Sequence, residues 1–341
     1  MTSTQASPAQ WPVAVIGCGR MGRLHARAYS QLSKARLVGV YDINPDSAAA
    51  VADEFSCTVF TSLEEMLPQV KAVTIAVPTN LHPQIAEPFL KRGISCLIEK
   101  PLAQDVARAR QIIETAKSGG AVVQVGHIER FNPAFRAMQR LSIQPRFIEV
   151  TRISPLTFRS IDVGVVLDMM IHDIDIVLQL ANSNVAKIDA VGVSVIGQVE
   201  DICNARVTFE NGCVANITAS RLALKTERRI RVFSADAYVS VDYQKRYGIV
   251  ARRGQNLSAI RDAVARIRSG EINDISELNF MDLVQVQELA IDEIDPLRAE
   301  LENFIEASQG NCQPAVTAEQ GLAAVELATR IVESITPQSL E

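Results

Sequence analysis

The chain has 341 residues, enough for two domains, and 48% of them are hydrophobic against 21% charged. Its formal net charge of −5 argues against nucleic-acid binding, which requires a basic face, so we expect no nucleic-acid partner. The six cysteines are scattered without a C-x-x-C pair. This spacing predicts reduced thiols, no zinc site built from them, and a cytoplasmic location.

The first ten residues are polar and contain neither the basic nor the hydrophobic segment of a signal peptide, which predicts a flexible leader over 1–10. No uncharged apolar run reaches membrane-spanning length. The best candidate, Val163–Leu180, is interrupted by Asp168, His172, Asp173 and Asp175. We therefore expect no membrane partner.

A short apolar run, Val13–Ile16, leads directly into the pattern G-x-G-x-x-G formed by Gly17, Gly19 and Gly22. Such a run is typical of a strand buried on both faces of a parallel sheet, and a helical pattern follows it. Gly17 permits a sharp turn, Gly19 lets a pyrophosphate approach the backbone, and Gly22 lets the helix pack close to the sheet. The first N–H groups of that helix then face the phosphates.

A second strand-like run, Ala35–Tyr41, ends at Asp42, about 20 residues after the last glycine, where the ribose-binding acid of a dinucleotide fold belongs. A carboxylate accepts hydrogen bonds from the two ribose hydroxyls and repels a 2′-phosphate. No Arg or Lys follows in Ile43–Pro45. The sequence therefore predicts NAD as the cofactor, rather than NADP. The alternative is a glycine-rich turn that binds nothing.

Strand-like and helical patterns alternate as far as residue 125, which predicts a doubly wound parallel sheet and an NAD-binding domain over 11–130. Asn80 is expected to cap the helix that ends at Leu90. Ligands of such a sheet lie beyond the carboxyl ends of its strands. Besides the elements already named, we expect helices at 46–55, 62–67, 80–90 and 104–117, and strands at 58–60, 72–77, 94–98 and 121–125.

From about Phe147 the strand-like runs follow one another through short turns such as Asn211-Gly212. This pattern predicts a C-terminal α+β domain over 131–336 with a large, open, mostly antiparallel sheet, so that the whole chain is of the α/β class. Expected strands lie at 147–153, 188–195, 204–209, 214–219, 229–233, 238–243 and 283–289, and helices at 163–180, 257–267, 296–307 and 318–334.

Two places could carry acid–base chemistry. Asp168, His172 and Asp175 are spaced to share one face of the helix at 163–180, and a histidine oriented by an acid can remove a proton. The alternative is a surface Asp–His pair beside solvent. Lys100 follows a core strand and could stabilise a developing alkoxide, or it could form a solvated pair with Glu99.

Three motifs in this order resemble the Gfo/Idh/MocA (glucose–fructose oxidoreductase, inositol dehydrogenase, rhizopine catabolism) family over nearly the whole chain. The resemblance implies a Rossmann domain followed by an open-sheet domain, and a catalytic group of Lys100, Asp168 and His172. It also implies a homodimer or homotetramer joined through the exposed face of the open sheet. The motifs are Gly17-x-Gly19-x-x-Gly22, Glu99-Lys100-Pro101 and Asp168-x-x-x-His172-Asp173-Ile174-Asp175.

Two further stretches, 125–133 and 162–168, resemble the bacterial branch of this family that oxidises UDP-N-acetylglucosamine at its 3-hydroxyl. In that branch the 3-keto product goes to an aminotransferase for amide-linked lipid A. Two alternatives stay open. One is a dehydrogenase of an inositol, a free hexose or a UDP-uronic acid, and the other is a non-catalytic NAD-binding protein.

These arguments define the expected site. The NAD contacts lie at the carboxyl ends of strands: Gly17, Gly19, Arg20, Met21, Gly22, Asp42, Pro78, Thr79, His82, Glu99 and Lys100. Candidates for binding the substrate and its diphosphate are His127, Arg130, Arg152, Arg159 and Arg221. His82 could instead only begin a helix, and each arginine could be a surface residue of the sheet. No metal is expected at His127, Asp168, His172 and Asp175, because hydride transfer needs none.

Overall fold

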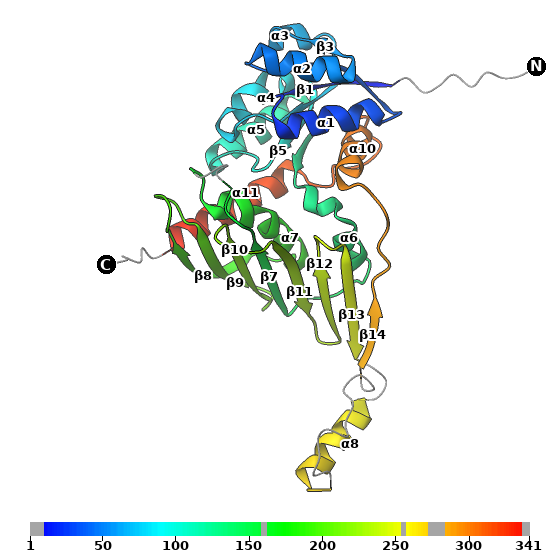
Figure 1. Cartoon of the computed structure of the whole chain (residues 1–341), viewed down its shortest axis with the longest axis vertical. Coiled ribbons are helices and arrows are strands. Elements are labelled where there is room, and N and C mark those ends of the chain that lie inside the picture. The colour runs from blue at the N-terminus through cyan, green and yellow to red at the C-terminus, as the bar shows by residue number, and fades with distance from the viewer. Residues whose placement is uncertain (1–9, 158–161, 254–256, 272–283, 336–341) are drawn as a thin grey trace, which may run out of the picture. The chain divides into compact units, whose positions relative to one another are not determined.

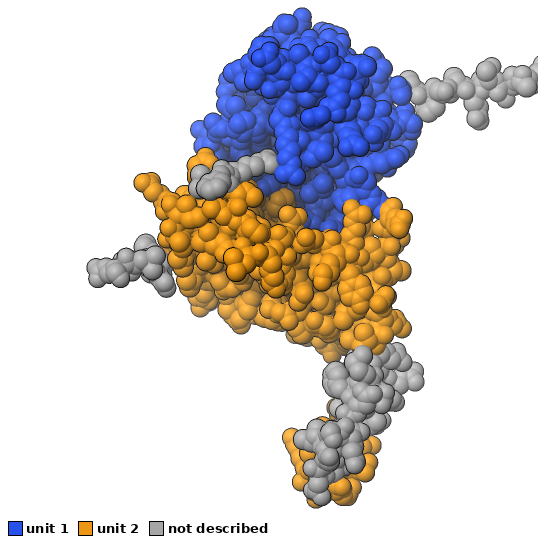
Figure 2. Space-filling model, in the orientation of Figure 1, with its two compact units in different colours: residues 1–132, 174–176, 294–333 blue, residues 133–173, 177–293, 334–341 orange. Residues whose placement is uncertain are grey.

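The computed structural model describes residues 10–157, 162–253, 257–271 and 284–335 (Figure 1). The chain divides into two compact units, which Figure 2 shows in different colours. Unit 1 comprises 1–132, 174–176 and 294–333, and unit 2 comprises 133–173, 177–293 and 334–341. Each unit contains one sheet, and the predicted α/β fold class is confirmed.

The sheet of unit 1 is parallel, in the order β3-β2-β1-β4-β5-β6. This is the doubly wound order, and it reverses between β1 and β4, where such sheets bind their ligands. All four residues of β4 are buried, as expected of a central strand in a parallel sheet, and its one polar residue, Thr74, shares a hydrogen bond of 2.9 Å with the Tyr29 hydroxyl. The strands are β1 (Trp11–Ile16), β2 (Ala35–Tyr41), β3 (Thr58–Val59), β4 (Ala72–Ile75), β5 (Ser95–Glu99) and β6 (Val123–Gly126).

Side-chain caps begin several helices of unit 1. Asn44 accepts a hydrogen bond from the N–H of Asp46 at 3.0 Å, and Asp105 accepts one from Arg108 at 2.8 Å. The helical elements, in which η marks a turn of another type, are α1 (Arg20–Gln31), α2 (Pro45–Phe55), α3 (Leu63–Met66), η1 (Thr79–Leu81), α4 (His82–Leu90), α5 (Val106–Gly119), η2 (Ile128–Phe131), α10 (Pro296–Ser308) and α11 (Ala318–Ser334).

The predicted cap at Asn80 is wrong. Asn80 lies inside η1, and Leu81 precedes α4 without a side-chain cap. The N–H of Leu81 donates to the carbonyl oxygen of Pro78 at 2.9 Å, so the chain makes a tight turn before the α-helix begins.

The two C-terminal helices belong to unit 1, whereas the sequence analysis placed them in the second domain. Leu301, Phe304 and Ile305 of α10 are buried in one core cluster with Val13 and Val15 of β1. Residues near the start of α11 join a second cluster, which includes Ala14 and Ile16 from the opposite face of β1. Apolar residues therefore pack on both faces of the sheet, and α10 and the start of α11 supply some of them.

The sheet of unit 2 has the order β14-β13-β12-β11-β7-β10-β9-β8. Among the described strands, every neighbouring pair is antiparallel except β7 with β10. The strands are β7 (Phe147–Ile153), β8 (Val185–Val193), β9 (Ile202–Phe209), β10 (Val214–Ser220), β11 (Glu227–Phe233), β12 (Ala237–Asp242), β13 (Tyr247–Arg253), which was not predicted, and β14 (Val284–Glu288).

One face of this sheet is buried and the other is half-exposed. Along β7 and β11, buried residues such as Ile148 and Ile230 alternate with half-exposed ones such as Glu149 and Arg231, which form an ion pair of 2.7 Å. Alternation of this kind is what made the strands recognisable in the sequence. The helical elements of unit 2 are α6 (Pro133–Gln139), η3 (Val166–Met170), α7 (Ile171–Ala181) and α8 (Leu257–Arg268).

In the described part of the chain, no helix is long and apolar enough to cross a membrane. All six cysteines are free thiols: Cys18, Cys57, Cys96, Cys203, Cys213 and Cys312.

Candidate active site

The glycine loop after β1 has the shape that a dinucleotide site needs. Gly17 has a φ of +91°, and a Cβ there would overlap the carbonyl oxygen of Ala76. A Cβ at Gly22 would overlap the carbonyl oxygen of Gly17. At Gly19, by contrast, a Cβ would meet nothing within 4 Å. Two of the glycines are thus required by close packing, and the third leaves open space where a pyrophosphate can approach.

The amino end of α1 can receive an anion. Gly19 precedes the helix and provides no side-chain acceptor for the first N–H groups, which the helix itself leaves unbonded. Arg20 is exposed and Met21 is half-buried in the same turn. These residues fit the phosphates of NAD.

Asp42 lies at the carboxyl end of β2 and is fixed by two backbone donors. Its Oδ2 accepts from the N–H of Cys18 at 2.6 Å, and its Oδ1 accepts from Asn44 at 2.8 Å. Each oxygen retains a second lone pair, so the carboxylate can still accept from ribose hydroxyls. Burial, assisted by the Asp42 charge, raises the pKa of the Cys18 thiol to about 12, so Cys18 is not a nucleophile here.

Ile43 was not among the residues expected to contact NAD. Its side chain is 91% exposed directly after Asp42. An exposed aliphatic side chain next to Asp42 is suited to pack against the flat face of the adenine of NAD. The only signal in the sequence was an apolar residue in a turn.

His82 connects two loops at the carboxyl edge of the sheet. Its Nε2 lies 3.1 Å from the carbonyl oxygen of Val77, and its Nδ1 lies 3.1 Å from that of Pro101. The ring is 1% exposed, and burial lowers its pKa. This geometry favours a structural role for His82. Of the other two residues expected to contact NAD here, Pro78 is exposed and Thr79 is half-buried.

Glu99 and Lys100 end β5 and face different surroundings. Lys100 is half-exposed, whereas the side chain of Glu99 is only 13% exposed. Glu99 Oε1 lies 2.9 Å from His25 Nε2, and Oε2 accepts from the backbone N–H of Lys100 at 3.3 Å. Burial opposes ionisation of Glu99, but His25 and Lys100 together lower its pKa. The expected alternative of a solvated Glu99–Lys100 pair does not fit this buried carboxylate.

The helix that carries Asp168 and His172 begins with a π-helical turn, η3, and continues as α7. Single π turns in α-helices are frequent at functional sites. Asp168 lies within η3, and both it and His172 are half-buried. Asp175 is 1% exposed, so it is more deeply buried than Asp168 and His172.

The neighbouring acids of this helix are neutralised by arginines that the sequence analysis had assigned to the substrate. Arg130 donates to both oxygens of Asp175, at 2.6 and 2.8 Å. Arg152 donates to both oxygens of Asp173, at 2.7 and 2.8 Å. All four side chains are at most 5% exposed. Such burial favours a structural role over contact with a diphosphate.

His127, another candidate for binding the substrate, is 1% exposed, and burial lowers its pKa. Arg159 lies outside the described residues. No group of three or more His, Cys, Asp or Glu side chains in the described ranges is arranged to hold a metal ion.

A network around Arg221 fixes the start of the same helix. Arg221 Nε donates to Asp201 Oδ1 at 2.6 Å, and its Nη1 donates to the carbonyl oxygen of Val163 at 2.8 Å. Glu200 Oε1 accepts from the N–H of Val166 at 3.1 Å. A Cβ at Gly164 would overlap the Glu200 carboxylate. Glu200 and Asp201 were not predicted, because nothing in the sequence connects them with a helix more than 30 residues earlier.

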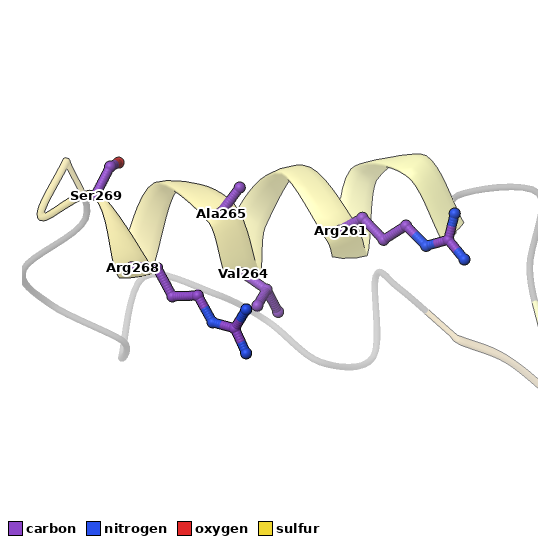
Figure 3. Close-up of a pocket in the computed structure, with 5 residues that line it drawn as sticks. All are labelled: Arg261, Val264, Ala265, Arg268 and Ser269. Carbon is purple, nitrogen blue, oxygen red and sulfur yellow. The ribbon is translucent and has the colours of Figure 1, made fainter.

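A hollow of about 560 Å³ lies along α8 (Figure 3). It is lined by Arg261, Val264, Ala265, Arg268 and Ser269. None of these side chains is a general base at neutral pH, and none belongs to the expected site.

Two family models match the chain. The first, described as an oxidoreductase family with an NAD-binding Rossmann fold, matches residues 12–127. The second, described as the GFO/IDH/MocA C-terminal domain, matches residues 145–240. The protein is thus an NAD-binding oxidoreductase of two domains.

Known proteins give the same class. A UDP-N-acetylglucosamine 3-dehydrogenase from Acidithiobacillus ferrooxidans is 40% identical over 230 residues, 67% of this chain and 73% of that protein. Its crystal structure matches with a TM-score of 0.85 and 31% identity, covering 96% of this chain and 98% of the other. An inositol 2-dehydrogenase from Rhizobium meliloti is 27% identical over 94% of this chain and 96% of its own length. The chain belongs to the Gfo/Idh/MocA oxidoreductase family.

Arg152→Met tests the structural assignment of the buried arginine. The change leaves Asp173 buried without its cation, and we expect the free energy of unfolding to fall by about 3–5 kcal/mol. Chemical denaturation measures it. The matched control is Arg110→Met, which breaks the exposed pair with Glu326 and should cost less than about 1 kcal/mol. Unchanged stability together with a raised KM for a nucleotide sugar would contradict the structural assignment and indicate that Arg152 binds the substrate.

Asp42→Ala tests the ribose assignment. Loss of a charged acceptor should weaken NAD binding about tenfold to a hundredfold and narrow the preference for NAD over NADP. Titration of cofactor fluorescence with NADH and NADPH measures both effects. Asp46→Asn, an exposed change in the next helix, should leave both affinities as they are. An Asp42 variant with wild-type affinities would contradict the assignment.

Proposed function

We propose that the protein oxidises a secondary hydroxyl of a sugar with NAD, and that its substrate is UDP-N-acetylglucosamine, converted to the 3-keto sugar. The observation that carries the chemistry is the half-buried pair Asp168 and His172, on a helix whose next acids, Asp173 and Asp175, are already neutralised. The observation that favours this sugar is the 40% identity to an enzyme of that name.

The chemistry divides among three side chains. His172 removes the hydroxyl proton as general base, and Asp168 orients the imidazole. Lys100 stabilises the oxygen as negative charge develops on it. When NAD is bound, it accepts the hydride from the carbon that carries this hydroxyl group. The oxidation therefore yields a ketone, a proton held on His172, and the reduced cofactor.

The chemistry of the product indicates which class of reaction would consume it. A 3-keto sugar can accept an amino group at that carbon, so the proposed consumer is an aminotransferase that prepares the sugar for amide-linked lipid A. An oxidation at a different sugar carbon would not supply that reaction.

The second candidate substrate is an inositol. It is favoured by the match to an inositol 2-dehydrogenase, which extends over 94% of this chain although the identity is only 27%. A free hexose or a UDP-uronic acid would be handled by the same three side chains. A non-catalytic NAD-binding role is disfavoured, because Lys100, Asp168 and His172 are all present at strand and helix positions suited to chemistry.

A substrate comparison tests the proposed function directly. We expect NADH to form with NAD and UDP-N-acetylglucosamine at a kcat/KM at least about a hundredfold above those with UDP-glucose and myo-inositol. Absorbance of NADH measures the rates. UDP-glucose retains the diphosphate and lacks the N-acetyl group, so it is the matched control. A higher kcat/KM with myo-inositol would select the second candidate, and NAD binding with no turnover on any sugar would select the non-catalytic role.

His172→Ala tests the assignment of the base. Removal of a general base should lower kcat by about a hundredfold or more, while NADH binding stays at the wild-type affinity. Steady-state kinetics and fluorescence titration measure the two effects. Gln179→Ala, on a half-buried part of the same helix, should preserve turnover. Near-normal kcat in the His172 variant would remove that residue from the mechanism.

A further inference from the structure

The helix that carries Asp168 and His172 starts after a glycine, which has no side chain to cap it. The backbone oxygen of Gly164 accepts from the N–H of Asp168 at 3.0 Å, so Gly164 directly precedes the first helical turn. The N–H groups of Val165 and Val166 come next, and a helix provides no partner of its own for such groups. Residues 164–166 are all buried, so the acceptors have to come from another part of the protein.

Glu200 supplies both acceptors. Its backbone oxygen accepts from the N–H of Val165 at 3.0 Å, and its Oε1 accepts from that of Val166 at 3.1 Å. A carboxylate at the amino end of a helix is also stabilised by the helix dipole. A single residue between β8 and β9 thus provides the cap that Gly164 lacks.

The loop that carries Glu200 is itself held firmly. The next residue, Asp201, is fully buried, and its Oδ2 accepts from two backbone N–H groups of the same loop, each at 2.7 Å. Its Oδ1 accepts from Arg221 Nε at 2.6 Å, and Arg221 Nη1 donates to the carbonyl oxygen of Val163. One guanidinium group therefore connects the loop with the chain just before the helix.

The space beside Gly164 is filled by the Glu200 carboxylate. A Cβ at residue 164 would overlap this group, and the three atoms nearest to it would all belong to it. Gly164 does not have a positive φ, so its backbone conformation is open to other residues. The close approach of Glu200 is thus a sufficient reason for a glycine here.

We propose that Glu200 is a positioning residue for the catalytic pair: by capping this helix it sets where the first turn starts, and hence where Asp168 and His172 are held. The inference rests on the roles proposed for these two residues. The connection is short, because the peptide group between 164 and 165 donates to Glu200 through its N–H and accepts from Asp168 through its oxygen. Misplacement of a reacting group by about 1 Å can cost on the order of a hundredfold in rate.

The first experiment measures the cap without any turnover. Hydrogen exchange of the full-length protein, followed by mass spectrometry of peptides that cover 163–170, reports the protection of the Val165 and Val166 N–H groups. Glu200→Ala removes the carboxylate, so exchange there should be about tenfold faster. Glu200→Gln keeps an oxygen acceptor at the same position, so exchange should stay within about twofold of wild type. Glu210→Ala is the matched control, because that exposed acid follows β9 and bonds Asn184 instead.

The second experiment measures turnover of the sugar that the substrate comparison finds to be oxidised fastest. In Glu200→Ala, kcat should fall about tenfold, while KM and the affinity for NADH change less than about threefold. Glu200→Gln should restore kcat to within about twofold of wild type, and Glu210→Ala should leave it as it is. When combined with His172→Ala, the Glu200→Ala change should have no further effect on the residual rate, since no base remains to be positioned. Simple loss of folded protein would lower the rate in both backgrounds.

Gly164→Ala tests the contact from the other side. The added methyl group should displace the Glu200 carboxylate from Val166, so kcat should fall by about the same factor as in Glu200→Ala. The double variant should lose no more than either single change, because both remove the same hydrogen bond. Losses that multiply in the double variant would show that the two residues act separately, and would contradict the inference.

Three further outcomes would overturn it. They are wild-type exchange over 163–170 in Glu200→Ala, wild-type kcat in Glu200→Ala despite faster exchange, and an equal loss of kcat in the Ala and Gln variants. Failure of the proposed function gives a different result. Near-normal turnover in His172→Ala would refute the assignment of the base, whereas the exchange rates would still report the cap that Glu200 provides.

Discussion

A buried carboxylate is stable only where a cation or a hydrogen-bond donor compensates it, and the candidate active site depends on how this chain meets that requirement. Arginines hold the buried aspartates of unit 2 and of the short segment at 174–176. In the parallel sheet, His25 and a backbone N–H hold Glu99. The pairs are Arg130–Asp175, Arg152–Asp173, Arg221–Asp201 and His25–Glu99.

The pairing of these acids distinguishes residues that stabilise the fold from residues that we propose to act in catalysis. Asp173 and Asp175 are fully paired and buried, so they fix the helix that carries them. Asp168 and His172 on the same helix remain half-buried, as does Lys100 at the end of β5. The general base and the oxygen-stabilising cation that we propose must reach the substrate, and the partial exposure of these three residues is compatible with those roles.

Membership of the family and the choice of substrate depend on different evidence. The glycine loop, Asp42 and the order of the parallel strands define a cofactor domain that many dehydrogenases share. Two of the arginines first considered for a diphosphate, Arg130 in unit 1 and Arg152 in unit 2, are instead paired with buried aspartates. The identity of the sugar therefore rests on the similarity to a UDP-N-acetylglucosamine 3-dehydrogenase and on the substrate comparison proposed above.

The sequence by itself determined the elements whose signals are local. Strand β7 was predicted at its observed bounds, and the glycine loop and Asp42 lie where their spacing placed them, because turns and periodicity depend on neighbouring residues. The tertiary structure alone decided which charges are paired and which helices cover which sheet. Arg221 reaches Val163 from 58 residues away, and α10 joins the first strand from the far end of the chain. Such contacts leave no periodic trace, since ion pairing and burial depend on partners that only the folded chain brings together.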